Sequence, residues 1–153
     1  MLGKKIVVKF NDGKIIKGCT TDFSPNRDSF HVSLTDDYQD KEQSDQLEIS
    51  LGNIKAVFFV KDFKGNKEYQ KVRTFNGYDS GPPSQRKIIV IFKDGENFYG
   101  TTHSYSPDRN GFFVYPIDED DNNDRVFVPR SALEKVHVKK YGSENFDIFL
   151  YEN

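Results

Sequence analysis

One stretch of this sequence occurs twice, and it decides the fold. Residues 5–32 read KIVVKFNDGKIIKGCTTDFSPNRDSFHV, and residues 87–114 read KIIVIFKDGENFYGTTHSYSPDRNGFFV. The two stretches align without a gap at an offset of 82 residues, and 13 of the 28 aligned positions are identical. Identity this dense indicates an internal duplication. The period exceeds that of common solenoid repeats, so we expect two copies of one module and not an array.

The repeat continues more loosely beyond each stretch. Residues 47–49 and 54–60 match residues 126–128 and 133–138 at an offset of 79. The change of offset falls in a polar stretch, and surface loops tolerate such changes of length. We therefore predict a first module over residues 1–63 and a second module over residues 87–153. Residues 64–86 are predicted to be a linker, because their second half is rich in Gly, Pro and Ser.

Each module is predicted to form five short strands. Apolar residues alternate with other residues in 5–10, which is typical of a half-buried strand. Asn11-Asp12-Gly13 favours a hairpin turn, because glycine readily adopts the positive φ that such turns need. Gly18 suggests a bulge or bend in the return strand. This all-β pattern predicts two tandem small barrels, and residues 145–151 predict an extra strand, either at an edge or joining the halves.

The composition excludes several classes of protein. Fourteen Phe and eight Tyr support an aromatic core on pleated surfaces. A net charge of −2 argues against a broad surface for nucleic acid or acidic membranes. No apolar run approaches the ~20 residues that span a bilayer, and no signal-type start is present, so we expect a cytoplasmic protein without a membrane partner. The single cysteine, Cys19, excludes an internal disulfide.

The hairpin pattern resembles the first sequence motif of Sm and Sm-like proteins. In residues 7–23 an apolar strand precedes Asp12-Gly13, Gly18 follows, and Phe23 opens the next turn. Residues 51–57, which read LGNIKAV, are similar to the second Sm motif. The second module shares the first motif but has Arg130-Ser131 in the second one. The resemblance implies Sm-like (SH3-like) five-stranded barrels that associate through their sheet edges.

The resemblance assigns no RNA-binding residue. RNA sites of Sm proteins use a loop Asn and the Arg-Gly of the second motif, whereas this chain has residues 24–28 in that loop and Leu51-Gly52 in that motif. The combination Asp-Gly, Phe-Ser-Pro-Asn-Arg and Phe-His also resembles an uncharacterised bacterial domain that can accompany PilZ domains. PilZ domains bind cyclic dinucleotides, but their paired arginines are absent from this sequence.

A turn of the form Ser-Pro-Asn/Asp-Arg occurs in both modules and supplies the candidate ligand site. An arginine on a proline-stiffened turn can present its guanidinium to a phosphate or carboxylate. The alternative is structural, because Ser, Pro, Asn and Asp are common turn formers. The candidate ligand-binding residues are Ser24, Asn26, Arg27, Ser106, Asp108 and Arg109.

We predict no catalytic residue, metal site or cofactor. His31 aligns with Phe113 and His103 with Thr21, so neither position requires an imidazole. The acidic run 118–124 lacks the spacing of an EF-hand loop. The leading hypothesis is a non-enzymatic binding or assembly module that contacts a protein partner or itself through sheet edges. The alternatives are binding of RNA or single-stranded nucleic acid, which the net charge does not favour, and sensing of a cyclic dinucleotide.

Overall fold

The computed structural model describes residues 3–34, 46–65, 75, 85–103, 105–118 and 120–151. The predicted all-β class is confirmed, and no helix among these residues has the length and apolar character needed to cross a membrane. The strands are β1 (Lys4–Phe10), β2 (Ile15–Thr20), β3 (Ser29–Leu34), β4 (Gln46–Ser50), β5 (Ile54–Val60), β6 (Arg86–Phe92), β7 (Asn97–Thr102), β8 (Gly111–Pro116), β9 (Asn123–Pro129), β10 (Leu133–Lys139) and β11 (Phe146–Leu150). Two 3-10 turns, η1 (Leu51–Asn53) and η2 (Arg130–Ala132), precede β5 and β10.

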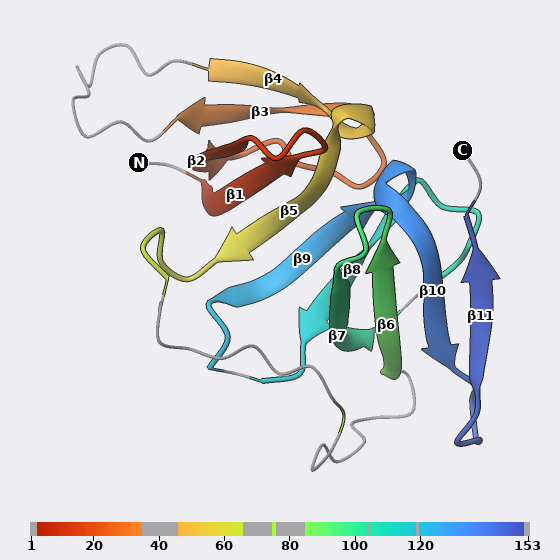
Figure 1. Ribbon diagram of the computed structural model, residues 1–153. Coiled ribbons are helices and arrows are strands. Elements are labelled where there is room, and N and C mark those ends of the chain that lie inside the picture. Colours follow the sequence, from red (N-terminus) through yellow and green to blue (C-terminus); the bar gives the residue numbers. More distant parts are fainter. Residues whose placement is uncertain are drawn as a thin grey trace.

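The strands form one open antiparallel sheet in the order β11-β10-β6-β7-β8-β9-β5-β1-β2-β3-β4. Figure 1 shows β1 to β4 at the upper left, β6, β7, β10 and β11 at the lower right, and β5 beside β9 between them. We expected two tandem small barrels that associate through their sheet edges. The structure shows one open sheet, which the pairing of β5 with β9 makes continuous from one half to the other. Among the described strands β11 pairs with β10 and with no other, so of the two places predicted for the last strand the sheet edge is the correct one.

The two halves share their strand order and their register. β1 and β6 occupy equivalent places, since Ile6 pairs with Gly18 and Ile88 pairs with Gly100, 82 residues further on. The pairing of β1 with β5 skips Lys55, and the pairing of β6 with β10 skips Glu134, which lies 79 residues later. Both skipped residues are β-bulges, which add one residue to a strand and redirect its side chain. Residues of the two halves can therefore be compared position by position.

Gly18 marks a close approach of two strands, where we had expected a bulge or bend. It pairs with Ile6 on one side and with Leu34 on the other. A Cβ atom at this position would overlap the carbonyl oxygen of Ser33 and lie 2.6 Å from a methyl carbon of Val32. The absence of a side chain therefore lets β2 and β3 cross closely, and Gly100 does the same for β7 and β8.

The buried apolar residues form two hydrophobic cores, and each core contains residues of both halves. In β5, Val57 and Phe59 pack into the core of the first half, whereas Ala56 packs into the core of the second. In β9, Phe127 packs into the first core, whereas Val126 packs into the second. Successive side chains of a strand point to opposite faces, so both strands are buried on two sides. The β5–β9 pair therefore joins the halves through their interiors as well as through backbone hydrogen bonds.

Candidate functional site

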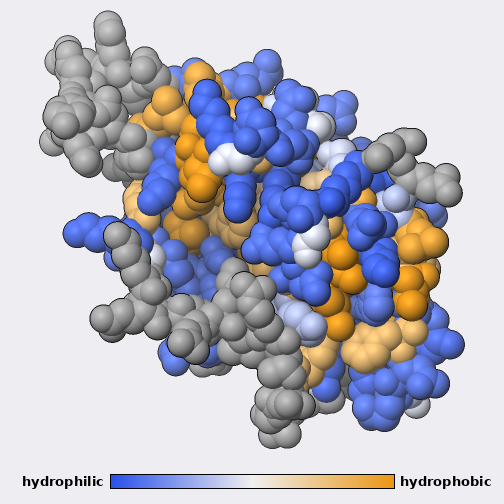
Figure 2. Space-filling model, viewed as in Figure 1, coloured by the Kyte–Doolittle hydropathy of each residue, from blue (hydrophilic) through white to orange (hydrophobic). Residues whose placement is uncertain are grey.

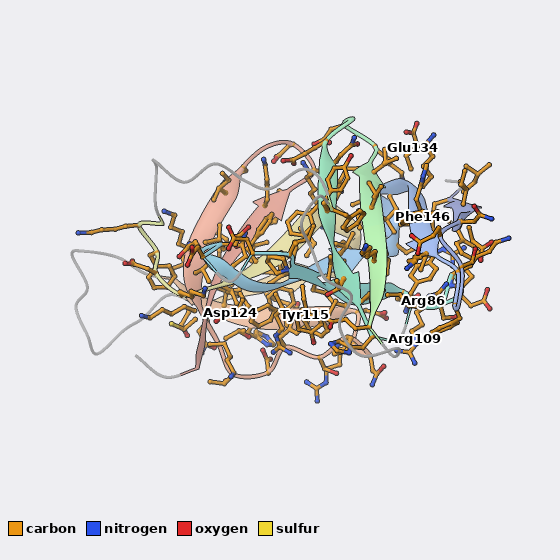
Figure 3. All side chains as sticks on the ribbon, turned by 90° about the horizontal axis from the view of Figure 1, so that it is seen from below. Arg86, Arg109, Tyr115, Asp124, Glu134 and Phe146 are labelled. Carbon is orange, nitrogen blue, oxygen red and sulfur yellow. The ribbon has the colours of Figure 1, made fainter. Side chains whose placement is uncertain are left out.

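The two predicted ligand turns are closed by their own backbone. The amide of Arg27 donates to the carbonyl of Ser24 at 3.2 Å, and the amide of Asn26 donates to the Ser24 hydroxyl at 3.3 Å. The amide of Arg109 donates to the carbonyl of Ser106 at 3.3 Å. Both arginines and Asp108 are exposed, and Arg109 lies at the periphery in Figure 3. These contacts give the turns a structural role, and their role in ligand binding stays a prediction.

Each ligand turn ends at a hollow between η1 and η2. Asp28 and Asn110, which follow the two arginines, line this hollow of about 500 Å³. Their carbonyls accept hydrogen bonds from the amides of Leu51 at 2.9 Å and Arg130 at 2.7 Å, so both 3-10 turns are held in the same way. Lys93 and Arg130 supply positive charge to the walls. The sequence analysis did not predict that the loops of the two halves meet here.

A buried lysine crosses the junction of the halves. Lys55 is only 5 % exposed, and its ammonium donates to Asp94 Oδ2 at 2.6 Å and to Glu96 Oε1. The ammonium also lies 4.6 Å from the centre of the Phe92 ring. Lys55 belongs to β5, whereas its three partners lie on the β6–β7 hairpin. The bulge directs this side chain away from its own half and onto the hairpin of the other half.

The ion pair changes the pKa values of its members. Burial would lower the pKa of Lys55, but hydrogen bonds to Asp94 and Glu96 outweigh it and the pKa is raised. The hydrogen bond from Lys55 lowers the pKa of Asp94, against a smaller opposing effect of burial. Both changes favour the charged forms, so the pair is ionised at neutral pH.

Aromatic rings form the second contact between the halves. Phe23, from the turn before β3, lies 5.1 Å from Phe127 and 6.0 Å from Phe113, both of which belong to the other half. The guanidinium of Arg125 lies 4.4 Å from the ring centre of Phe113 and 4.5 Å from that of Phe59. Edge-to-face rings and a stacked guanidinium add to the stabilisation that buried area supplies. The described residues of the junction are therefore predominantly apolar, apart from the buried Lys55 and the two carboxylates that it contacts.

At the other end of the sheet, β11 contacts the equivalent aromatic residue. Tyr105 aligns with Phe23, and its ring centre lies 5.3 Å from that of Phe149 on β11. The Tyr105 hydroxyl shares a short hydrogen bond with the hydroxyl of Tyr151. Burial, followed by this hydrogen bond, raises the pKa of Tyr105 far above its usual value, so the phenol is neutral. Phe75, in the predicted linker, stacks on Phe146 of β11 at 6.1 Å.

The β4 edge is open, although its equivalent in the other half is covered. β4 pairs with β3, and no other described strand lies beside it. Leu47 of β4 is 40 % exposed, whereas the equivalent Val126 of β9 is fully buried. A hollow of about 470 Å³ lies beside Leu47 and is lined by the turn residues Asp12 and Lys14. Within the part of the chain that the structure describes, the outer side of β4 therefore has no strand partner and has an apolar surface, and such an edge can accept a further strand.

His31 lies on β3, next to the β4 edge strand, in a polar cluster. Its backbone amide donates to Asp22 Oδ1 at 2.9 Å, and its Nδ1 lies 2.7 Å from Asp22 Oδ2. Burial would raise the pKa of Asp22, but hydrogen bonds from the backbone and side chain of His31 lower it. Cys19 lines a small hollow together with Asp22 and His31. Burial raises the pKa of its thiol, which disfavours the nucleophilic thiolate. Within the described residues, no three His, Cys, Asp or Glu side chains are grouped to hold a metal.

The sequence analysis missed Lys55, Asp94 and Glu96, although one signal was available. Lys55 interrupts the apolar run of residues 54–60, and a lysine is rarely buried without a partner. Its partners could not be identified, because they lie about 40 residues away in sequence, as shown by separations of 39 and 41. The role of β4 as an edge strand was missed for a similar reason, since strand order depends on long-range pairing, whereas an edge place was one of the two predicted for residues 145–151.

Comparisons with known proteins identify the family but not its activity. The chain belongs to DUF6982, a family of unknown function, whose model matches residues 2–140. The match includes ten strands and ends before β11, which begins at Phe146. Comparisons with curated proteins and with solved structures find no match.

Proposed function

We propose that this member of DUF6982 is a non-enzymatic assembly module whose open β4 edge takes up a further strand. One observation carries the proposal. β4 and β9 have equivalent places in the two halves, yet β9 is covered by β5 while the outer side of β4 has no described neighbour. The β5–β9 pair is thus an example, within the chain, of the contact that β4 lacks.

The proposal includes an origin by duplication of an Sm-like five-stranded unit. The common strand order, the common register and the bulges at Lys55 and Glu134 support it. Closure of each unit into its own small barrel would account for the two hydrophobic cores. In this interpretation the chain contains two units, with one joint already formed and one edge left free.

The surface beside β4 supports strand addition over small-molecule binding. Leu47 and the adjacent hollow form a shallow apolar strip along the edge. Backbone hydrogen bonds to an added strand supply affinity, and the side chains beside it supply specificity. In the second half, Ala56 and Phe58 of β5 fill the corresponding space and complete the core there. A strand added to β4 would complete the first core in the same way.

Sedimentation velocity over a wide range of concentration tests this proposal. We expect the full chain to associate, and Leu47→Lys to weaken the association by placing a charge against the added strand. Asn26→Lys, which adds the same charge on an exposed turn, is the matched control and should associate like the wild type. A wild-type chain that stays monomeric throughout, or equal association by both variants, would contradict the proposal.

A second candidate function is binding of nucleic acid or a cyclic dinucleotide. The observation that favours it is the hollow between η1 and η2, where Lys93 and Arg130 face a space of about 500 Å³. Arg130 is partly engaged, since its Nη1 donates to the carbonyl of Pro107 at 2.6 Å. Arg27 and Arg109 lie one residue before two other lining residues, Asp28 and Asn110, and could extend such a site.

Titration at low salt tests this second candidate. Calorimetry with oligouridylate and with a cyclic dinucleotide should detect binding that weakens as salt rises, because phosphate contacts release counterions. Arg27→Ala and Arg109→Ala should each reduce the affinity if the ligand turns take part. The absence of heat with either ligand at low salt would remove this candidate and leave the assembly proposal unaffected.

A further inference from the structure

β11 occupies on β10 the place that β9 occupies on β5. Val57 of β5 pairs with Phe127, and the equivalent Val136 of β10 pairs with Phe149. Both pairs of strands are antiparallel, and both phenylalanines contact the equivalent aromatic residue of the preceding turn, Phe23 or Tyr105. β11 therefore occupies, on β10, the place that β9, the fourth strand of the second half, occupies on β5, and it does so with the same register.

β11 is held less firmly than β9. β9 has a paired strand on each side, whereas β10 is the one described strand that pairs with β11. Ile148 and Leu150 are 57 % and 75 % exposed, and Figure 2 shows apolar surface at the right margin, where β11 lies in Figure 1. His137, which pairs with Ile148, has a buried Nε2 without a partner in the described part of the chain. An unpaired buried polar atom destabilises the strand pair in which it lies.

The charges suit a joint between β10 and the β4 strand of a second copy. In the joint within the chain, Lys55 contacts Asp94 and Glu96. The residues at the positions of Lys55 and Glu96 are Glu134 and Lys14, so one attractive pair is kept with its charges reversed. Both side chains are exposed, and Glu134 lies at the periphery in Figure 3. Asp12 keeps the place of Asp94 and would face Glu134 as a like charge, so this joint has one attractive and one repulsive pair where the joint within the chain has two attractive pairs.

In the joint between β10 and β4, polar residues occupy the positions of the aromatic residues that contact one another across the β5–β9 joint. Phe23 is replaced by Tyr105, and on the partner side Phe113 and Phe127 are replaced by His31 and Glu48. A phenol, an imidazole and a carboxylate can hydrogen bond to one another and also tolerate water when separated. Permanent interfaces are more apolar than those that form and dissociate. This pattern fits a reversible joint.

From these observations we infer that β10 accepts β4 of a second copy of this chain in exchange for β11. The inference rests on the proposed function and adds the partner strand and its competitor. Copies would join head to tail, which gives a ring if the rotation closes and a filament if it does not. Because β11 is attached through a short turn, its high effective concentration keeps the joint closed until a second copy competes.

Exchanging the two charges tests the register of the joint. Lys14→Glu should lower the association constant about 5-fold, because Glu134 then faces two carboxylates, whereas Glu134→Lys alone exchanges the attractive and the repulsive pair. An equimolar mixture of the two variants should associate at least as strongly as the wild type, because the new lysine then faces two carboxylates. Lys64→Glu and Asp120→Lys make the same charge changes at exposed positions outside the joint and serve as controls. A mixture that associates no better than either variant alone would overturn the inference.

Locking β11 tests the exchange itself. Lys135 and Leu150 are opposite each other in the register, and opposed residues of antiparallel strands lie within disulfide reach. Lys135→Cys with Leu150→Cys, made in a Cys19→Thr background, should associate at least 10-fold more weakly when oxidised than when reduced. Phe149→Ser, which removes the contact with Tyr105, should raise the association constant at least 10-fold in a chain whose circular dichroism remains native.

The outcomes separate this inference from the proposed function. If oxidised and reduced chains associate equally and Leu47→Lys still abolishes association, β4 is an assembly edge but β10 is not its partner. If no form of the chain associates, including Phe149→Ser, both ideas fail. The comparison of oxidised with reduced chain does not depend on the folding of Phe149→Ser.

Discussion

Lys55 shows how one charged residue can set the relation between two halves of a chain. It is buried, and its partners Asp94 and Glu96 retain about half of their exposure, 53 % and 43 %. The charge that is left without a partner therefore differs between variants. Loss of the lysine leaves two carboxylates that water can reach, whereas loss of both carboxylates leaves a buried ammonium without a partner.

Urea unfolding should reveal this asymmetry. We expect Lys55→Met to destabilise the fold by about 1–3 kcal/mol, and Asp94→Asn with Glu96→Gln to cost about 3–5 kcal/mol, because the second change strands the buried charge. Glu134→Met is the matched control at the equivalent bulge, and a change at this exposed site should stay within about 0.5 kcal/mol. Equal effects of all three would show that the ion pair contributes nothing at neutral pH.

The same residues predict the dependence of stability on acid. Asp94 and Asp22 have folded-state pKa values below their ordinary 3.8, so their contribution is complete above that value and is lost as the pH falls through the lowered pKa. Urea midpoints measured from neutral pH to below pH 3.8 should show Asp94→Asn converging on the wild type. Lys55→Met should converge likewise, because its ammonium lowers the pKa of Asp94. A constant difference across this range would contradict the assignment.

At the scale of the element, Gly18 and Gly100 permit the close crossing of neighbouring strands. We expect Gly18→Ala to destabilise the chain by about 1–3 kcal/mol or more, because the added methyl group meets the rigid backbone of Ser33. Gly52→Ala is the control, since no atom lies within 4 Å of a Cβ there. Thermal unfolding of the two variants provides the measurement. Similar stability of both would mean that β2 and β3 can separate at little cost.

The sequence predicted most of the strands but few of the pairings between strands that are distant in sequence. Alternation in residues 5–10 and the Asn11-Asp12-Gly13 turn identify β1 and its hairpin, because these signals are local. The joint between β5 and β9 could not be predicted in this way, since it depends on pairing between distant strands. A partial signal was present, because β5 lacks the alternation of a half-buried strand and such runs are typical of strands covered on both faces.

The candidate site was predicted less well than the fold. The arginine turns were identified as motifs, and the structure accounts for their Ser and Asn residues through turn hydrogen bonds. The open edge at β4 was foreseen only as association through some sheet edge. Which strand remains free depends on the order of the whole sheet, and that order is a tertiary property.

At the scale of the whole molecule, the shared cores predict a single unfolding transition. Phe127 packs into the first core while its neighbour Val126 packs into the second, so neither half can lose β9 and keep its interior. We expect the calorimetric and van't Hoff enthalpies to agree, and Phe127→Leu to lower the one transition without splitting it. Two transitions with separate midpoints, or a variant that shifts only one of them, would show that the halves unfold independently.

The charges at the bulges of Lys55 and Glu134 also affect which halves can join. The backbone irregularity is the same in both halves, but it carries a cation in one and an anion in the other. Were two second halves to join, Glu134 would meet Asp94 and Glu96 and be repelled. Against a first half, Glu134 would meet Lys14 as well as Asp12, so the sign of the charge at this one irregular position disfavours the pairing of two second halves.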